Sequence, residues 1–254
     1  MRPILKCLLW DVDGTLAETE RDGHLQAFNH AFEALGLPWR WSEARYGELL
    51  AVAGGRERLL HDMQTRDDAP AGPRQRQALA ERLHRCKNLL YAGIIGTGKV
   101  ALRAGVRELL NDCARAGVRL GIVTTTSRSN VEALLKTHLG PDWAARFSAV
   151  ISADEAPRKK PDSQAYLLAL AALAARPMDA VAMEDAPAGI AAAHSAGVPV
   201  IVTRSHYFPS APAPGALAVG PSLGQTDGWN PPAAAHAGRI DLEQIIRWRE
   251  QRLQ

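Results

Sequence analysis

Apolar residues follow two different patterns along the chain. Between residues 24 and 91 they recur every three to four positions, the spacing of helices with one buried face, and no strand pattern interrupts them. Gly36 followed by Pro38, and the pair Gly54 and Gly55, mark the ends of two of these helices. The pattern predicts helices at residues 24–35, from a cap at Ser42 to the residues before Gly54, at 56–63 and at 73–91.

From about residue 99 onward, short apolar runs alternate with amphipathic stretches. The predicted strands are residues 118–123, 149–152, 180–183 and 198–202, and the predicted helices are residues 106–116, 129–139, 161–175 and 187–196. Together with a first strand that ends at Trp10, this alternation favours a parallel sheet with helices on both faces. Active sites of such sheets lie at the carboxyl ends of the strands.

The two patterns predict an α/β fold, with a doubly wound, Rossmann-like parallel-sheet core and an inserted all-helical cap domain. We expect residues 1–16 and 99–254 to form the core and residues 17–98 to form the cap, with hinges near residues 17–20 and 93–98. An insertion at this point lies over the strand ends, where it can close on a substrate.

The last fifty residues carry the weakest pattern. Residues 216–219 are predicted as an edge strand and residues 242–253 as a closing amphipathic helix. The segment 220–238 receives no assignment and is a candidate for partial disorder. We place no chemistry in it.

Composition narrows the class of protein. The 254 residues are 46% hydrophobic and 22% charged, which is typical of a globular chain. A net charge of +3 is too small to indicate nucleic-acid binding, although it suits a small anionic substrate. No apolar stretch approaches the roughly 20 residues of a membrane helix, and no signal peptide is recognisable. Cys7, Cys86 and Cys113 are odd in number and far apart, which favours reduced thiols. We expect a cytoplasmic monomer that binds neither nucleic acid nor membrane.

Candidate chemistry begins where the first strand ends, at Asp11-Val12-Asp13-Gly14-Thr15-Leu16. Gly14 lets the chain turn directly after Asp13, so both carboxylates can converge on one small volume. Crowded carboxylates repel each other unless a cation or a shared proton relieves them. A hard divalent cation, Mg2+ above all, is the simplest relief. Taken alone, Asp-x-Asp could equally be an ordinary turn with solvated acids.

The longer string Asp-x-Asp-Gly-Thr-Leu after an apolar strand resembles the signature of the haloacid-dehalogenase-like (HAD) superfamily, most of whose members are phosphatases. The resemblance implies that Asp11 is the nucleophile, which becomes an aspartyl-phosphate. It implies that Asp13 is the general acid and base and gives its backbone carbonyl to Mg2+. A carboxylate can attack phosphorus, and a second carboxyl nearby can protonate the leaving oxygen.

Three further motifs of this superfamily have counterparts at predicted strand ends. Thr124 matches the phosphate-binding hydroxyl, with the backbone of Thr125 and the side chain of Arg128 as further phosphate ligands. Lys160 before Pro161 matches the lysine that neutralises the transferring phosphoryl group, although the usual Pro-Asp after it is absent. Taken alone, the threonines could be a helix cap and the lysine a solvated helix start.

The fourth motif is the acidic pair Glu184 and Asp185, which follows a predicted strand. The resemblance implies that this pair completes a Mg2+ site with Asp11 and Asp13. Two adjacent acids could instead be a helix start that makes use of the helix dipole. Four motifs in the right order are far more specific than any one of them.

The predicted cap narrows the substrate. Its sequence is similar to the CbbY-type branch of the superfamily, beside the beta-phosphoglucomutases, through residues 17–24, 27–29, 46–50 and 54–58. Members of that branch dephosphorylate xylulose 1,5-bisphosphate, a misfire product and inhibitor of Rubisco. The substrate-binding candidates in the cap are Glu20, His24, Tyr46, Gly55, Arg56 and Arg58. The two arginines could instead form exposed helix salt bridges, and a lysine is usual where Arg56 stands.

The sequence therefore predicts a Mg2+-dependent phosphatase of small sugar phosphates. A beta-phosphoglucomutase-like isomerase uses the same motifs and stays an alternative. A non-catalytic sugar-phosphate binder is disfavoured, since such a protein would be expected to lose Asp11 or Asp13.

Overall fold

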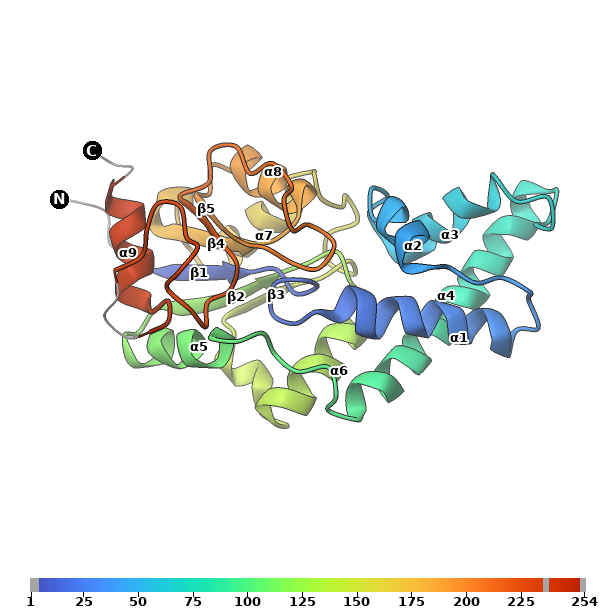
Figure 1. Ribbon diagram of the computed structural model, residues 1–254, viewed down its shortest axis with the longest axis horizontal. Coiled ribbons are helices and arrows are strands. Elements are labelled where there is room, and N and C mark those ends of the chain that lie inside the picture. Colours follow the sequence, from blue (N-terminus) through green and yellow to red (C-terminus); the bar gives the residue numbers. More distant parts are fainter. Residues whose placement is uncertain (1–4, 235–237, 252–254) are drawn as a thin grey trace.

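The core is a parallel sheet with the strand order β3-β2-β1-β4-β5-β6 (Figure 1). The structure, a computed structural model, describes residues 5–234 and 238–251. The strands are β1 (Cys7–Trp10), β2 (Arg119–Val123), β3 (Ala149–Ile151), β4 (Ala180–Glu184), β5 (Val200–Thr203) and β6 (Ala218–Gly220). The chain proceeds outward from β1 in both directions, so the turn after β1 lies at the switch point of the sheet. The predicted doubly wound α/β core is confirmed.

Strand β1 lies in the middle of the sheet and is buried on both faces. Leu8 pairs with Leu120 of β2 and with Val181 of β4. Because successive side chains of a strand point to opposite faces, Leu8 belongs to one apolar cluster and Leu9 to the other. Burial on both faces explains why this strand has a continuous apolar sequence rather than an alternating one.

Helices cover both faces of the sheet (Figure 1). On one face lie α5 (Val106–Arg115) and α6 (Arg128–Leu139), and on the other lie α7 (Gln164–Ala172) and α8 (Pro187–Ser195). The predicted bounds differ most at α7, which begins at Gln164 instead of Pro161. There the carboxylate of Asp162 accepts a hydrogen bond of 2.8 Å from the Gln164 backbone N–H, so the chain turns before the helix starts.

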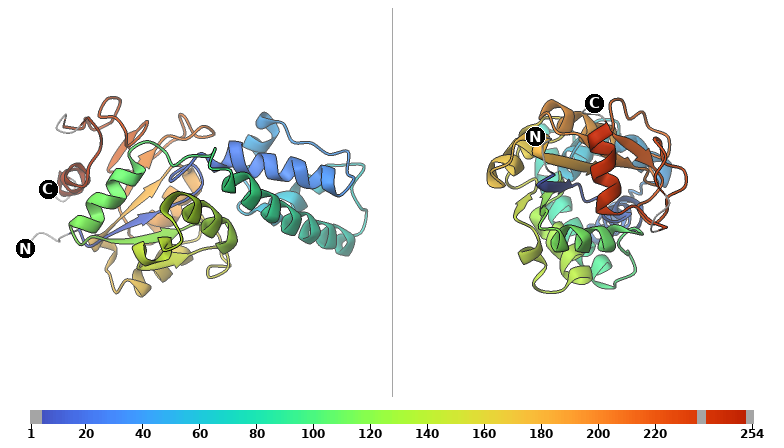
Figure 2. Two further views of the ribbon diagram at one scale, coloured as in Figure 1. Left: turned by 90° about the horizontal axis from the view of Figure 1, so that it is seen from below. Right: turned by 90° about the vertical axis from the view of Figure 1, so that its left-hand side faces the viewer.

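The predicted all-helical block is confirmed as a body of its own beyond one end of the sheet (Figures 1 and 2). It contains α1 (Gln26–Ala34), α2 (Glu43–Leu49), α3 (Gly55–Met63) and α4 (Pro73–Gly96), with a short π-helix at Glu20–Leu25 before α1. Its apolar cluster is built around the rings of Phe28, Phe32 and Trp41. Ser42 caps α2 as expected, accepting a hydrogen bond from the Arg45 backbone N–H at 3.1 Å. The division after residues 16 and 98 stays a prediction.

The return from the cap differs from the prediction. The sequence predicted a helix that ends at Tyr91, followed by a flexible path through Gly93 and Gly96, but α4 continues to Gly96. Its buried positions include Lys87, Tyr91 and Ile95, spaced four apart, so packing of one helix face continues through the glycines. Of the predicted hinge glycines, Gly98 does leave the helix, with a φ of +74°.

The C-terminal segment closes the far side of the core. β6 is the edge strand that was predicted, and Val219 exchanges two backbone hydrogen bonds with Asn230, both 2.9 Å long. Trp229 stacks on Trp248 of α9 (Leu242–Gln251) with ring centroids 4.8 Å apart, which orders much of the segment that lacked an assignment. Residues 235–237 of that segment, and the last two residues of the predicted closing helix, lie outside the described residues. Within the described part of the chain, no helix is both long and apolar enough for a membrane span.

Candidate active site

Asp11 and Asp13 lie at the carboxyl end of β1, as predicted. The backbone N–H of Asp11 donates to the carbonyl of Met183 at 3.0 Å, which continues the sheet pairing past β1. Gly14 then turns the chain with a φ of +86°, a conformation that favours glycine. A Cβ on Gly14 would lie 2.1 Å from Oδ2 of Asp185. The glycine therefore permits both the turn and the close approach of a third carboxylate.

Asp11, Glu184 and Asp185 form a buried cluster of carboxylates, with one oxygen from each within 4.8 Å of the others. Burial and the charge of Glu184 raise the pKa of Asp11 to about 7, against the opposing effect of Lys160. Burial and the charges of Asp11 and Glu184 raise the pKa of Asp185 well above its usual range. A buried cluster of three carboxylates, in which the pKa values of Asp11 and Asp185 are raised, fits a hard divalent cation such as Mg2+.

Lys160 is the cation that this cluster already contains. Its Nζ donates to Oδ1 of Asp11 and to Oε1 of Glu184, both at 2.7 Å, and to the carbonyl of Val123 at 2.8 Å. Burial opposes the charge, but the two carboxylates outweigh it and raise the pKa of Lys160. Tyr166 of α7 donates to the same Oε1 of Glu184 at 2.6 Å. Lys160 is therefore a charged ammonium fixed beside Asp11.

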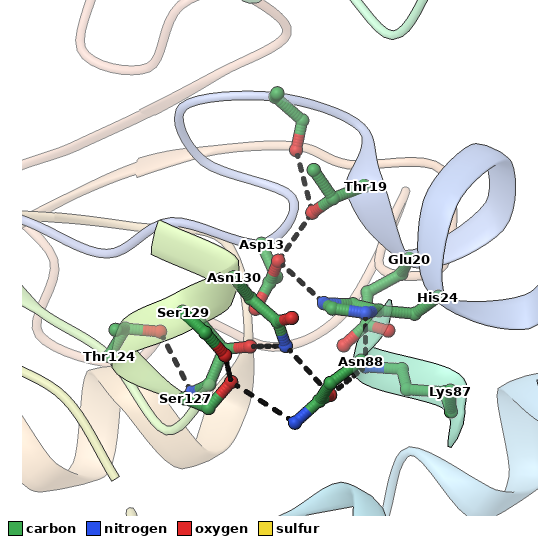
Figure 3. Close-up of polar contacts among 12 residues, drawn as sticks. Asp13, Thr19, Glu20, His24, Lys87, Asn88, Thr124, Ser127, Ser129 and Asn130 are labelled. Atoms are coloured by element: carbon green, nitrogen blue, oxygen red, sulfur yellow. Dashed lines mark hydrogen bonds and ion pairs between the residues drawn. The ribbon is translucent and has the colours of Figure 1, made fainter. Parts of the chain in front are cut away.

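Asp13 belongs to a second network, which extends into the cap (Figure 3). Its Oδ1 accepts a hydrogen bond from Thr19 at 2.5 Å and lies 2.9 Å from Nε2 of His24. The other ring nitrogen of His24 lies 2.7 Å from Nζ of Lys87 on α4, and the ring stacks on Tyr91. Burial disfavours the charge of Asp13, but His24 and Thr19 outweigh it and lower its pKa to about 2.

Lys87 is a fully buried lysine that the sequence analysis missed, because it stands in a long, mostly basic helix that resembles a solvated one. Burial lowers the pKa of Lys87 to about 7, although Asp13 and Glu20 oppose the shift. Its ammonium lies 5.0 Å from the centroid of Tyr91. The four-residue spacing of Lys87 and Tyr91 on the buried face of α4 was the available signal.

The turn after β2 differs by one residue from the prediction. Thr124 is buried, and its hydroxyl accepts a hydrogen bond of 3.2 Å from the Thr126 backbone N–H (Figure 3). Thr125 instead lines two adjoining cavities beside Asp13. The threonine that faces the site is therefore Thr125, and Thr124 acts as a capping residue of this turn.

Arg128 does not face the site, contrary to the prediction. Its guanidinium donates to Glu155 at 2.7 Å and to the carbonyl of Val150 at 2.9 Å. Its backbone N–H donates to Asp154 at 2.8 Å. The side chain is thus directed along the sheet edge by partners more than twenty residues away, which local sequence could not indicate.

In the cap, Glu20, Tyr46 and Arg58 converge on one another. The Tyr46 hydroxyl donates to Oε2 of Glu20 at 2.5 Å, and Arg58 donates to the same hydroxyl at 2.9 Å. Arg58 is buried, so the exposed salt bridge considered from the sequence is wrong for this residue. Arg56 is half-exposed and lies 3.3 Å from Glu57, and its assignment to the substrate stays a prediction.

Two cavities lie over this constellation. The one that we call the reaction cavity has a volume of about 390 Å³. It is lined by the core residues Asp11, Lys160, Glu184, Asp185, Ala186, Pro187, Ala188, Gly189 and Phe208 and by the cap residues Gly47, Leu50, Ala51 and Ala53, among others. The one that we call the distal cavity has a volume of about 300 Å³ and is lined by His24, Gly55, Arg56, His84, Lys87, Ser127, Asn130 and Lys159, among others. Asp13, Glu20, Arg58 and Thr125 line both cavities, so the two adjoin.

Comparison with known proteins agrees with this geometry. A family model for haloacid dehalogenase-like hydrolases matches residues 5–197. The plasmid form of protein CbbY from Cupriavidus necator is 40% identical over 247 residues, which cover 96% of each chain. The crystal structure of CbbY from Rhodobacter sphaeroides in complex with phosphate superposes with a TM-score of 0.78 at 38% identity, covering 84% of this chain and 92% of that one. A mutant of the same protein in complex with xylulose 1,5-bisphosphate gives a TM-score of 0.78 at 37% identity, with the same coverage. The chain belongs to the haloacid dehalogenase-like hydrolase family, in its CbbY branch.

Proposed function

We propose that this protein is a Mg2+-dependent phosphatase that hydrolyses a small sugar bisphosphate, with xylulose 1,5-bisphosphate as the substrate. The observation that most supports this proposal is the pair of adjoining cavities. One holds a nucleophile beside a lysine and a carboxylate cluster, and the other is lined by cations. The bisphosphate complex of the Rhodobacter sphaeroides relative supports this choice of substrate.

In the proposed reaction, the carboxylate of Asp11 attacks phosphorus and the bond from phosphorus to the sugar oxygen breaks. Asp13 gives its proton to that oxygen, which leaves an aspartyl-phosphate on Asp11. Asp13 then takes a proton from a water molecule, which attacks the phosphorus and releases Asp11. Lys160 holds one oxygen of Asp11 and lies close enough to neutralise the transferring group. Thr125, in place of Thr124, is the proposed phosphate-binding hydroxyl.

Mg2+ would be held by Asp11, Asp185 and Glu184, with the Asp13 backbone carbonyl, and when bound it would neutralise phosphoryl charge. Asp13 is held ionised by His24 and Thr19, which is the form that activates water. The first step needs Asp13 protonated, and the charge of an incoming phosphate raises the pKa of a neighbouring carboxyl.

Residues 17–98 are the proposed cap, and we expect the protein to be a cytoplasmic monomer.

The test is phosphate release with and without Mg2+ from xylulose 1,5-bisphosphate, ribulose 1,5-bisphosphate, phosphoglycolate and beta-glucose 1-phosphate, with Asp11→Asn as the inactive control. Strong preference for the xylulose compound is expected. Weak and equal release from all four compounds would overturn the substrate assignment while leaving the phosphatase chemistry. Formation of glucose 6-phosphate from glucose 1-phosphate would favour the mutase instead.

A further inference from the structure

An ion pair joins the cap to the core at the edge of the distal cavity. Nζ of Lys159, in the core, lies 2.5 Å from Oε2 of Glu57, in the first turn of α3. The pair packs against Gly54, where a Cβ would lie 2.2 Å from the Lys159 nitrogen and 2.3 Å from the Glu57 oxygen. Lys159 directly precedes Lys160, so one short segment sends one lysine to each cavity.

Glu57 neutralises two cations of the distal cavity at once. Its Oε2 pairs with Lys159, and its Oε1 lies 3.3 Å from Arg56. Burial disfavours the charge of Glu57, but the hydrogen bond from Lys159 outweighs it and lowers the pKa of the carboxyl. A dianionic phosphate group with its own oxygens could make the same contacts with both cations.

The other acids that line this cavity are held by partners other than Arg56 and Lys159. Asp13 is held by Thr19 and His24. Glu20 accepts a hydrogen bond from Tyr46 and lies 3.8 Å from Arg58. Asp154 accepts from the backbone of Arg128 at 2.8 Å. Among the described residues that line the cavity, Glu57 is the carboxylate that contacts both Arg56 and Lys159.

We propose that Glu57 stands in the place of the substrate's second phosphate, and that Lys159 is a specificity-determining residue which binds this phosphate when Glu57 is displaced. The proposal rests on the proposed function, because it assigns the second phosphate of the same substrate. It differs from the simpler possibility of a structural salt bridge between cap and core. If the pair were only a structural bridge, replacing Glu57 or Lys159 would remove it equally. If Glu57 occupies the phosphate site and Lys159 binds the phosphate, the two replacements should affect activity on the bisphosphate in opposite directions.

The test compares Lys159→Met and Glu57→Gln with the wild type. The readout is the ratio of kcat/KM for xylulose 1,5-bisphosphate to kcat/KM for p-nitrophenyl phosphate. We expect Lys159→Met to lower this ratio by about tenfold to a hundredfold, the range for a charge-assisted hydrogen bond, and Glu57→Gln to keep or raise it. Arg158→Met is the matched control, because it removes one positive charge from an exposed neighbour that pairs with Asp162.

The possible outcomes distinguish phosphate binding by Lys159 from a structural bridge, from an effect of net charge and from a wrong substrate. An equal fall of the ratio in both variants would overturn the proposal in favour of a structural bridge. A fall in Arg158→Met as large as in Lys159→Met would also overturn it, because net charge alone would then explain the effect. A wild type that hydrolyses p-nitrophenyl phosphate but not the bisphosphate would overturn the proposed substrate, and this proposal with it. Circular dichroism of each variant confirms that it is folded.

Discussion

The reaction cavity and the distal cavity adjoin, yet they are built in different ways. The first collects its acids from the ends of β1 and β4, where backbone topology brings them together. The second collects Arg56, Lys87 and Lys159 from cap helices and a core loop that meet by tertiary packing. Strand order therefore places the acids of the reaction cavity, while cap residues such as Leu50 complete its wall. The cations of the distal cavity come together only when the cap packs against the core.

Replacement of the nucleophile should affect the reaction cavity and the distal cavity most differently, because turnover should be lost while substrate binding is kept. Asp11→Asn should lower turnover of every substrate by roughly 10⁴-fold or more, the scale for loss of a nucleophile. The distal cavity is untouched, so the variant should still bind xylulose 1,5-bisphosphate. Calorimetry of that binding, beside phosphate release, checks both statements. Residual turnover within tenfold of the wild type would remove Asp11 from its role.

The sequence predicted the reaction cavity well because its residues follow strands. Asp11, Glu184 and Asp185 each come directly after an apolar run, and parallel strands end at one edge. The exception is the turn after β2, where the site faces Thr125 and not Thr124. Adjacent residues of an extended chain point in opposite directions, so an error of one position reverses the side chain.

The distal cavity could be predicted only in part. Arg56 and Gly55 were found through a local motif, but Arg128 was assigned wrongly because Glu155, which holds it, is far away in sequence. Lys87 and Lys159 were missed because each stands among other basic residues, a pattern that is typical of a solvated surface. Their roles come from contacts across 63 and 102 residues of chain, with His24 and Glu57.

Lys87 connects the two cavities, because it belongs to the cap and contacts His24, which in turn contacts Asp13. Lys87→Met should lower kcat for xylulose 1,5-bisphosphate and for p-nitrophenyl phosphate by roughly 10–100-fold, because Asp13 would lose part of the network that positions it. Equal effects on bisphosphate and p-nitrophenyl phosphate are expected. A loss confined to the bisphosphate would instead make Lys87 a ligand of the distal phosphate.

The same variant should be more stable than the wild type at pH 7. The folded-state pKa of Lys87 is lowered from 10.5 to about 7, so between these values the unfolded chain binds more protons. Stability of the wild type should therefore rise with pH across this range, because the unfolded chain gradually loses the proton that the folded Lys87 cannot keep. Urea unfolding should show Lys87→Met more stable by ~1–3 kcal/mol at pH 7, with the difference shrinking toward pH 10.

Removal of divalent cations should reveal the repulsion in the reaction cavity. The folded-state pKa of Asp11 is raised from 3.8 to about 7, so the folded chain binds more protons between these values. In chelator, stability should fall as pH rises from about 4 to about 7, and Mg2+ at pH 7.5 should restore it. If Mg2+ raises the free energy of unfolding by about 2 kcal/mol, Tm should rise by about 4–8 °C for a chain of this size. Asp11→Asn, which lacks one of the charges, should show a smaller pH dependence.

Tyr166 should give the smallest effect, and the one most confined to the reaction cavity. Its hydroxyl and Lys160 both donate to Oε1 of Glu184, which fixes that carboxylate beside Asp185. Tyr166→Phe keeps the buried ring and removes one hydrogen bond of about 1 kcal/mol, so Mg2+ affinity measured by calorimetry should weaken about fivefold. The ratio of the two substrates should not change, since no contact with the distal cavity is lost. An altered ratio with unchanged Mg2+ affinity would show that Tyr166 acts through Lys160 and the segment leading to Lys159, and that the two cavities are mechanically coupled.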